Sequence, residues 1–185
     1  ILLKELIKTY GGNNMLSKKV SELINDQINK ELYSAYLYLE FANIYSDFGL
    51  KGFENWYKIQ AQEERDHAML FFEYLQMNDI KPELKAIDMP DVKSAKAKDV
   101  LAQGLEHEEY VSSLIHAIYE VAYDEKDYRS MQFLDWFVKE QLEEEDNARE
   151  LITKFELFGD DPKSLYMLDQ ELSGRVYSAP SLSLS

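Results

Sequence analysis

Apolar side chains recur along most of the chain at steps of three and four residues, the spacing that places them on one face of an α-helix. Four long stretches carry this pattern, and glycine, proline and aspartate mark their ends. The pattern predicts helices over about 16–45, 51–77, 95–123 and 128–158. A short fifth helix is expected from Asp161 and Pro162 to about Gly174, since aspartate is a good N-cap and proline suits the first turn.

The lengths of the connections predict the topology. The links at 46–50 and 124–127 are short, so the helices that they join should run antiparallel. The link at 78–94 extends to about 55 Å, whereas a helix of about 28 residues is about 42 Å long. It can therefore return along the whole molecule, which predicts an all-α, up-down-down-up four-helix bundle with one long crossover between the second and third helices. The alternative is a disordered linker between two helical hairpins.

The two ends of the chain differ from this central domain, which we expect over 15–173. Residues 1–14 combine an amphipathic stretch with a Gly-Gly-Asn-Asn break before Met15, which resembles a translation start. They are either a fused peptide with its linker or a genuine N-terminal extension. Residues 174–185 are rich in serine and are predicted to form a flexible tail.

A carboxylate interrupts the apolar face of each long helix near its midpoint. The four residues are Glu31, Glu64, Glu108 and Glu144, the last accompanied by Gln141. His67 lies three residues after Glu64 and points the same way. Because the midpoints of neighbouring helices share one layer of a bundle, four carboxylates and an imidazole are expected to converge in the core. A single glutamate on an apolar face usually means that the face has been misassigned by one position. Four such glutamates, all at helix midpoints, favour a functional site.

Four unpaired carboxylates in a core are untenable, because each is costly to desolvate and like charges repel. No lysine or arginine lies on these faces. Either the pKa values are strongly raised or cations bind, and two divalent ions would balance four carboxylates. Carboxylate oxygens with one imidazole suit iron or manganese better than zinc. Two ions sharing Glu64 could reduce O2 jointly.

Three further residues lie close to these positions. Tyr38 follows Glu31 by two turns on the same face, so it is either a hydrogen-bond partner or electron donor for the site or a half-buried aromatic. His107 and His116 each lie one residue off the inner face of the third helix, and we expect both at the surface.

Composition narrows the classes of function. The chain has 20 Lys and Arg against 35 Asp and Glu, a net charge of −15, which argues against nucleic-acid binding and favours attraction of cations. The apolar content of 45% indicates a folded core. No apolar run is long enough for a membrane span, so no membrane partner is expected and the cytoplasm is the default location. Without cysteine there is no disulfide scaffold or thiolate-bound cluster.

Four segments, one on each long helix, resemble the motifs of the prokaryotic non-haem ferritins. They are Asn29–Tyr38, Gln62–His67, His107–Glu108 and Phe133–Glu145. The resemblance covers about 15–173 and implies a ferritin-like bundle within the di-iron superfamily. It also implies an iron store that oxidises Fe(II), with O2 or H2O2, at a di-iron centre in each subunit. The ferric mineral would lie inside a homo-oligomeric shell of 24 subunits with octahedral symmetry.

The resemblance, carried over residue by residue, implies three iron sites. The first would consist of Glu31, Glu64 and His67, and the second of Glu64, Glu108 and Glu144, with Gln141 nearby. A third, transit site would use Glu63, Glu140 and Glu143 or Glu144. Tyr38 and Trp136 match the aromatic residues beside the centre.

Departures from related families refine this expectation. The fourth helix carries Gln141-x-x-Glu144 where the general di-iron pattern has Glu-x-x-His, which favours turnover of iron into a store. Arg65 takes the position of the haem-ligating methionine of bacterioferritins, so no haem is expected. Ligands within one bundle argue against the small DNA-protecting relatives. The alternatives are a non-storing di-iron oxidase or peroxidase, and an engineered ferritin scaffold in which residues 1–14 carry a docking peptide.

Overall fold

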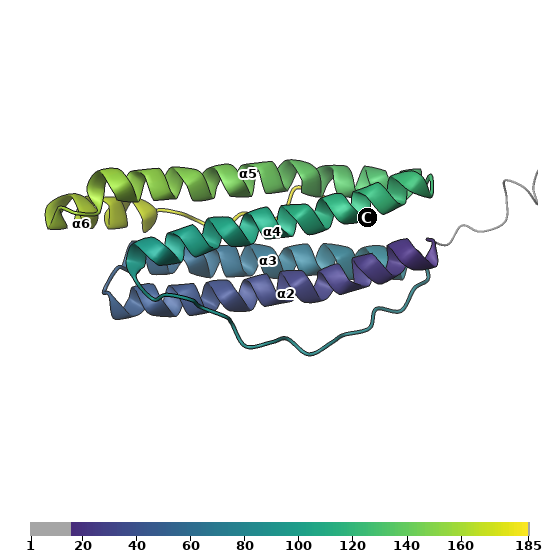
Figure 1. Ribbon diagram of the computed structural model, residues 1–185, viewed down its shortest axis with the longest axis horizontal. Helices are drawn as coiled ribbons and strands as arrows, with labels where there is room; N and C mark the ends of the chain where they lie inside the picture. The colour runs from purple at the N-terminus through teal and green to yellow at the C-terminus, as the bar shows by residue number, and fades with distance from the viewer. Residues whose placement is uncertain (1–15, 185) are drawn as a thin grey trace, which may run out of the picture.

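Five α-helices make up the regular structure of residues 16–184, the part of the chain that this computed structural model describes. The four long helices lie side by side and the short one lies at one end (Figure 1). Their bounds are α2 Lys18–Asp47, α3 Lys51–Met77, α4 Ala97–Asp124, α5 Tyr128–Phe158 and α6 Pro162–Leu172. The predicted all-α fold is confirmed, with α2 and α4 each beginning two residues later than expected. The expected extension at 1–14 lies outside the described residues.

The path of the chain confirms the up-down-down-up order. Short turns join α2 to α3 and α4 to α5, and residues 78–96 return along one side of the bundle, so that α3 and α4 run parallel (Figure 1). Side chains from one ridge of α2 hold this crossover. Asn25 bonds both the backbone N–H and carbonyl of Glu83, at 2.7 and 3.0 Å, and Tyr33 Oη accepts from the N–H of Asp91 at 3.1 Å. The alternative of a disordered linker is therefore wrong.

Two apolar clusters form the core. The first contains Ile24 of α2, Phe71 of α3, Ile115 of α4 and Phe137 of α5, and the second contains Phe41, Phe53, Leu101 and Leu151 of the same helices. Each long helix therefore passes from one cluster to the other along its length. The segment between the two clusters is the one that carries the acidic residue on every helix, so the fold places these residues in one polar layer at mid-bundle.

Helix α6 is fastened to the beginning of α3. Asp161 caps α6 by accepting from the N–H of Ser164 at 2.7 Å. Asp169 Oδ1 accepts from the N–H groups of Gly52 and Phe53, at 2.7 and 3.1 Å, which would otherwise lack partners in the first turn of α3. A Cβ atom on Gly52 would lie 1.7 Å from the carbonyl oxygen of Asp169, so the contact requires glycine.

The tail after α6 runs back along the bundle. The Asn55 amide donates to the carbonyl of Arg175 at 3.1 Å, Trp136 Nε1 donates to Ser181 Oγ at 2.9 Å, and Leu182 packs against the first apolar cluster. We expected a flexible tail from its composition, whereas the structure gives these residues defined contacts with α3 and α5.

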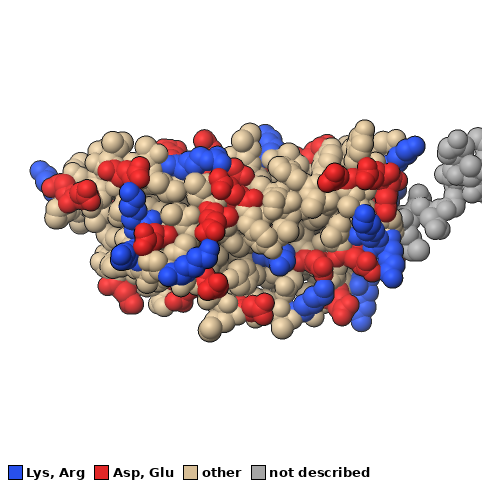
Figure 2. Space-filling view, viewed as in Figure 1, with Lys and Arg blue, Asp and Glu red and all other residues tan. Residues whose placement is uncertain are grey.

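The surface carries both signs of charge. On the face that Figure 2 shows, acidic and basic side chains are interspersed along the bundle. Surface ion pairs include Lys98 with Glu156 at 3.0 Å. Across residues 16–184, no helix is both long enough and apolar enough to span a membrane.

Candidate metal centre

Six polar side chains fill the layer between the two apolar clusters. They are Glu31 of α2, Glu64 and His67 of α3, Glu108 of α4, and Gln141 and Glu144 of α5. None of them exposes more than 6% of its surface. Since all four helices contribute, the layer exists only in the folded bundle.

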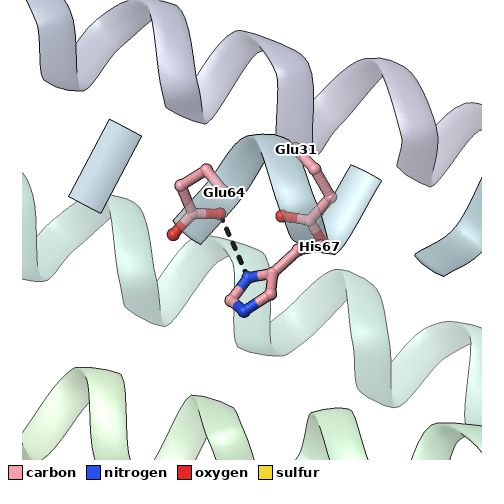
Figure 3. A group of neighbouring side chains, drawn as sticks. All are labelled: Glu31, Glu64 and His67. Atoms are coloured by element: carbon pink, nitrogen blue, oxygen red, sulfur yellow. Dashed lines mark ion pairs between the residues drawn. The ribbon is translucent and has the colours of Figure 1, made fainter. Parts of the chain in front are cut away.

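One group of three residues has the geometry of a metal site. Glu31, Glu64 and His67 each offer one ligand atom, and these atoms lie within 4.8 Å of one another (Figure 3). Ligands at about 2.0–2.2 Å from one ion are at most about 4.4 Å apart, so only a small adjustment is needed. His67 Nδ1 lies 3.6 Å from Glu64 Oε2, with the carboxylate of Glu31 beside them. Among residues 16–184, no other three such residues are grouped this closely.

Unpaired oxygens mark the same group. Glu31 Oε2 and Glu64 Oε1 are buried without a hydrogen-bond partner. The other oxygen of Glu31 accepts from Gln27 Nε2 at 2.8 Å. Buried carboxylate oxygens normally have partners, and a cation at this position would supply one.

The second group of carboxylates is held by neighbouring side chains. Tyr38 Oη and Gln141 Nε2 donate to the two oxygens of Glu108, the latter at 3.2 Å. Gln60 Nε2 donates to Glu144 Oε2 at 2.8 Å. A void of about 20 Å³ lies between Tyr38, Glu108 and Glu144, which is enough for about one water molecule.

The layer holds protons when no cation is present. Burial and the neighbouring carboxylate of Glu64 raise the pKa of Glu31 well above its ordinary value. Burial, followed by repulsion from Glu108 and Glu144, does the same to the pKa of Glu64. Burial raises the pKa of Glu108 to about 8, with Glu144 as the next cause. A bound cation would compete with these protons, so metal binding and proton release are coupled.

The residues expected at the third site line a cleft at the surface. Glu63 and Glu140 are half-buried and Glu143 is exposed, and all three border a cleft of about 240 Å³ together with Glu144 and residues of the tail. His67 Nε2 lies 4.0 Å from Glu140 Oε1, so the imidazole stands between this cleft and the buried group. Burial raises the pKa of Glu63 to about 7, although a nearby Arg175 opposes the rise.

Aromatic rings flank the layer on two sides. The Trp136 ring lies edge-on to His67 with 5.5 Å between ring centroids, and Tyr38 lies 5.7 Å from Tyr57. Tyr38 is buried, and burial together with Glu108 raises the pKa of its phenol, which therefore keeps its proton and donates.

His107, which was expected at the surface, is half-buried. Its Nε2 is 2.7 Å from Ser34 Oγ, its ring is 5.8 Å from that of Tyr38, and burial lowers its pKa to about 4. Although His107 lies one residue off the inner face of α4, the adjacent α2 covers that flank. His116 is exposed, as expected.

Three partners of the site were missed from the sequence. Gln27 precedes Glu31, to which it donates, by four residues on α2, and this spacing could have indicated the pair. Gln60 lies on the inner face of α3 but donates to Glu144 of α5, a partner that no spacing on its own helix indicates. Arg175, which pairs with Glu63, lies in the tail and follows no helical pattern.

Comparison with known proteins agrees with this architecture. The family described as "Ferritin-like domain" matches residues 21–158. A curated "Bacterial non-heme ferritin" of Campylobacter jejuni is 37% identical over 164 residues, which cover 89% of this chain and 98% of the relative. One from Staphylococcus haemolyticus is 34% identical over 88% of this chain and 98% of its own length.

Solved structures of similar sequence have the same fold. An open-pore ferritin from the archaeon Archaeoglobus fulgidus is 41% identical, with a TM-score of 0.84 over 87% of this chain and 98% of its own. A form of the Archaeoglobus ferritin engineered to be closed gives 40% identity and a TM-score of 0.85 over 88% and 99%. With its four-helix core, its mid-bundle carboxylates and these relatives, the chain belongs to the ferritin family.

Proposed function

We propose that this protein oxidises Fe(II) in the polar layer of its bundle and stores the product as a ferric mineral inside a shell of 24 copies. The observation that carries the proposal is the buried group of Glu31, Glu64 and His67 with two unpaired carboxylate oxygens. None of the described lysines and arginines forms an ion pair with a carboxylate of the layer that would take the place of a metal.

Different residues of the layer would bind each of two ferrous ions. Glu31 and His67 would hold the first ion, Glu108 and Glu144 the second, and Glu64 would lie between them. Each ion gives up one electron, and the two electrons with two protons reduce O2 to H2O2; with H2O2 as oxidant, the same two electrons yield water. Loss of protons from the glutamates on binding keeps the layer close to neutral.

The neighbouring groups would position this chemistry. Tyr38 and Gln141 fix the carboxylate of Glu108, so the second ion meets a carboxylate that is already oriented. Tyr38 and Trp136 are also close enough to the layer to supply an electron. No haem takes part in this proposal, and the cleft at Glu63, Glu140 and Glu143 would pass iron between the centre and the store.

Two further features support a shell. Apolar side chains are exposed along α2 and the crossover, among them Tyr36 at 51%, Leu84 at 67% and Met89 at 84%. A neighbouring copy of the chain would cover them. The acidic excess of −15 would draw Fe(II) toward and into the shell. The cytoplasmic location expected from the sequence is also part of the proposal.

Aerobic addition of Fe(II) tests the chemistry. The wild-type protein should oxidise it in a fast phase, and Glu64→Ala should lose that phase because both ions depend on this carboxylate. Glu73→Ala, an exposed glutamate on the same helix, is the matched control and should react like the wild type. An unchanged fast phase in Glu64→Ala would refute the site.

Light scattering with iron analysis tests storage. A mass near 24 subunits and an iron load far above three ions per subunit are expected after aerobic loading. A monomer or dimer that oxidises iron without retaining it would instead indicate a non-storing di-iron enzyme.

A further inference from the structure

The tail covers the cleft that leads to the buried centre. Glu63, Glu140 and Glu143 border the cleft on the side of the bundle, and residues 178–181 border it on the side of the tail. The tail is attached at both ends of this stretch. Tyr177 Oη donates to Asp66 at 2.5 Å, and Ser181 Oγ accepts from Trp136 at 2.9 Å.

Arg175 places a positive charge on one of the three carboxylates. Its Nη2 donates to Glu63 Oε2 at 2.7 Å, its Nη1 donates to the carbonyl of Trp56 at 3.3 Å, and its guanidinium lies 4.0 Å above the Trp56 ring. The side chains of Arg175 and Glu63 are only 17% and 16% exposed. Solvent screens such a stacked and mostly shielded pair less than it screens an exposed ion pair, although burial still raises the pKa of Glu63.

The guanidinium on Glu63 Oε2 and a metal ion on the same carboxylate compete, because each draws on the single negative charge of Glu63 and their positive charges repel. We propose that Arg175 occupies the third iron site as a tethered cation, so that an ion arriving at Glu63 must displace Arg175 and loosen the tail. The inference rests on the proposed function and adds a residue that sets the affinity of its transit site.

The arrangement explains how a cluster of carboxylates can pass iron on without retaining it. Glu63, Glu140 and Glu143 line one cleft, and their three carboxylates would attract a divalent ion. With Arg175 as competitor the affinity falls, and the returning guanidinium helps the ion to leave. His67, whose Nε2 lies 4.0 Å from Glu140, would receive the ion on the side of the buried centre.

Anaerobic calorimetric titration with Fe(II) tests the affinity. We expect wild-type protein to bind two ions tightly and a third more weakly. Arg175→Gln should tighten the third step by about tenfold or more, which corresponds to about 1.4 kcal/mol, and leave the first two unchanged. A chain ending at Gly174 should behave in the same way. Lys98→Gln, which removes an exposed ion pair elsewhere, is the control.

Fluorescence tests the displacement without any oxidation. The chain has two tryptophans, and the tail contacts both, Trp56 through Arg175 and Trp136 through Ser181. In a Trp136→Phe background, Zn²⁺ should change the emission of Trp56 at the third binding step, since the guanidinium leaves the ring. Adding Arg175→Gln should remove that change.

Opposite results would overturn the inference. If Arg175→Gln and the shortened chain leave the third affinity unchanged or weaken it, Arg175 does not compete with the metal but orders Glu63 for it. If the emission of Trp56 does not change at the third binding step, the guanidinium is not displaced from its ring. Failure of the proposed function looks different, because Glu64→Ala would then leave iron oxidation unaltered.

Discussion

Tyr38 of α2 donates a hydrogen bond to the carboxylate of Glu108 on α4, and both side chains are buried in the polar layer. Gln141 holds the other oxygen of Glu108, so neither oxygen is free. Glu31 and Glu64 differ, because each keeps one oxygen without a partner. The layer therefore combines a carboxylate that is already oriented with two that are open to a cation.

Replacing Tyr38 with phenylalanine should separate binding from oxidation. The variant loses one hydrogen bond to Glu108, which costs about 1–2 kcal/mol and corresponds to about a tenfold slower reaction if the loss falls on the transition state. The number of Fe(II) ions bound anaerobically should stay the same, and stopped-flow measurements should show slower oxidation. Tyr119→Phe, which removes a hydrogen bond from a half-buried tyrosine to Asp135 at the surface, should change neither. Oxidation at the wild-type rate in Tyr38→Phe would exclude a role for the phenol.

Replacing Glu64 with glutamine should stabilise the metal-free protein. In the metal-free protein Glu64 must either keep a charge buried among three other carboxylates or hold a proton at a strongly raised pKa. Glutamine avoids both costs at the same side-chain volume, so a gain of about 1–3 kcal/mol is expected. The same variant should lose most of the rise in melting temperature that Zn²⁺ gives the wild-type protein. Calorimetry with a chelator and then with Zn²⁺ checks both. A metal-free variant that melts below the wild type would show that Glu64 has an unrecognised partner.

The metal-free protein should become less stable as the pH rises from about 5 to 8. Glu108 has its pKa raised from 4.5 to about 8 by burial and by Glu144. In this range the folded state keeps a proton that the unfolded state has lost, so the free energy of unfolding falls by up to about 1.4 kcal/mol per pH unit for one such group. The favourable contribution is complete below pH 4.5 and is lost above pH 8. Glu63, whose pKa is raised to about 7, acts in the same direction.

Chemical unfolding of the metal-free protein at several pH values measures this slope. The comparison variant Glu108→Gln removes this carboxyl group together with the repulsion by which it raises the pKa of Glu64. The variant should show the smaller decline. Equal slopes in the two proteins would mean that Glu108 titrates normally in the folded state.

Replacing Gly52 with alanine should detach α6 from the bundle. The new Cβ atom would lie 1.7 Å from the backbone oxygen of Asp169, which a side-chain adjustment cannot relieve. We expect a loss of about 2 kcal/mol or more, with faster hydrogen exchange in α6 and the tail. Lys51→Ala, at the exposed neighbouring residue, should cost less than about 1 kcal/mol. Unchanged exchange in α6 would show that the Asp169 contact is dispensable.

The helices and the polar layer could be predicted because both follow from periodicity. The apolar pattern has the period of the helix, so a glutamate on it, such as Glu31 or Glu108, must point inward whatever its neighbours are. The long link at 78–94 gave the topology from length alone. The side chains that hold it, Asn25 and Tyr33, were not anticipated because they lie on the outer ridge of α2.

Contacts outside the helical pattern could not be predicted. Arg175 reaches Glu63 across 112 positions of sequence, and no local spacing links them. The tail that carries it has the composition of a disordered segment, yet polar contacts to Asn55, Asp66 and Trp136 hold it, together with packing against the first apolar cluster. The burial of His107 could not be predicted for a related reason. How far a neighbouring helix covers the flank of α4 does not follow from the sequence of α4 itself.

The polar layer between the two apolar clusters also fixes the register of the helices. A slip of one helix by a single turn of four residues would move its glutamate by about 6 Å along the axis, out of the layer and into an apolar cluster. Purely apolar helix faces would accept such a slip at little cost, because one aliphatic side chain replaces another. The four glutamates therefore exclude misaligned bundles during folding, before any ion has bound.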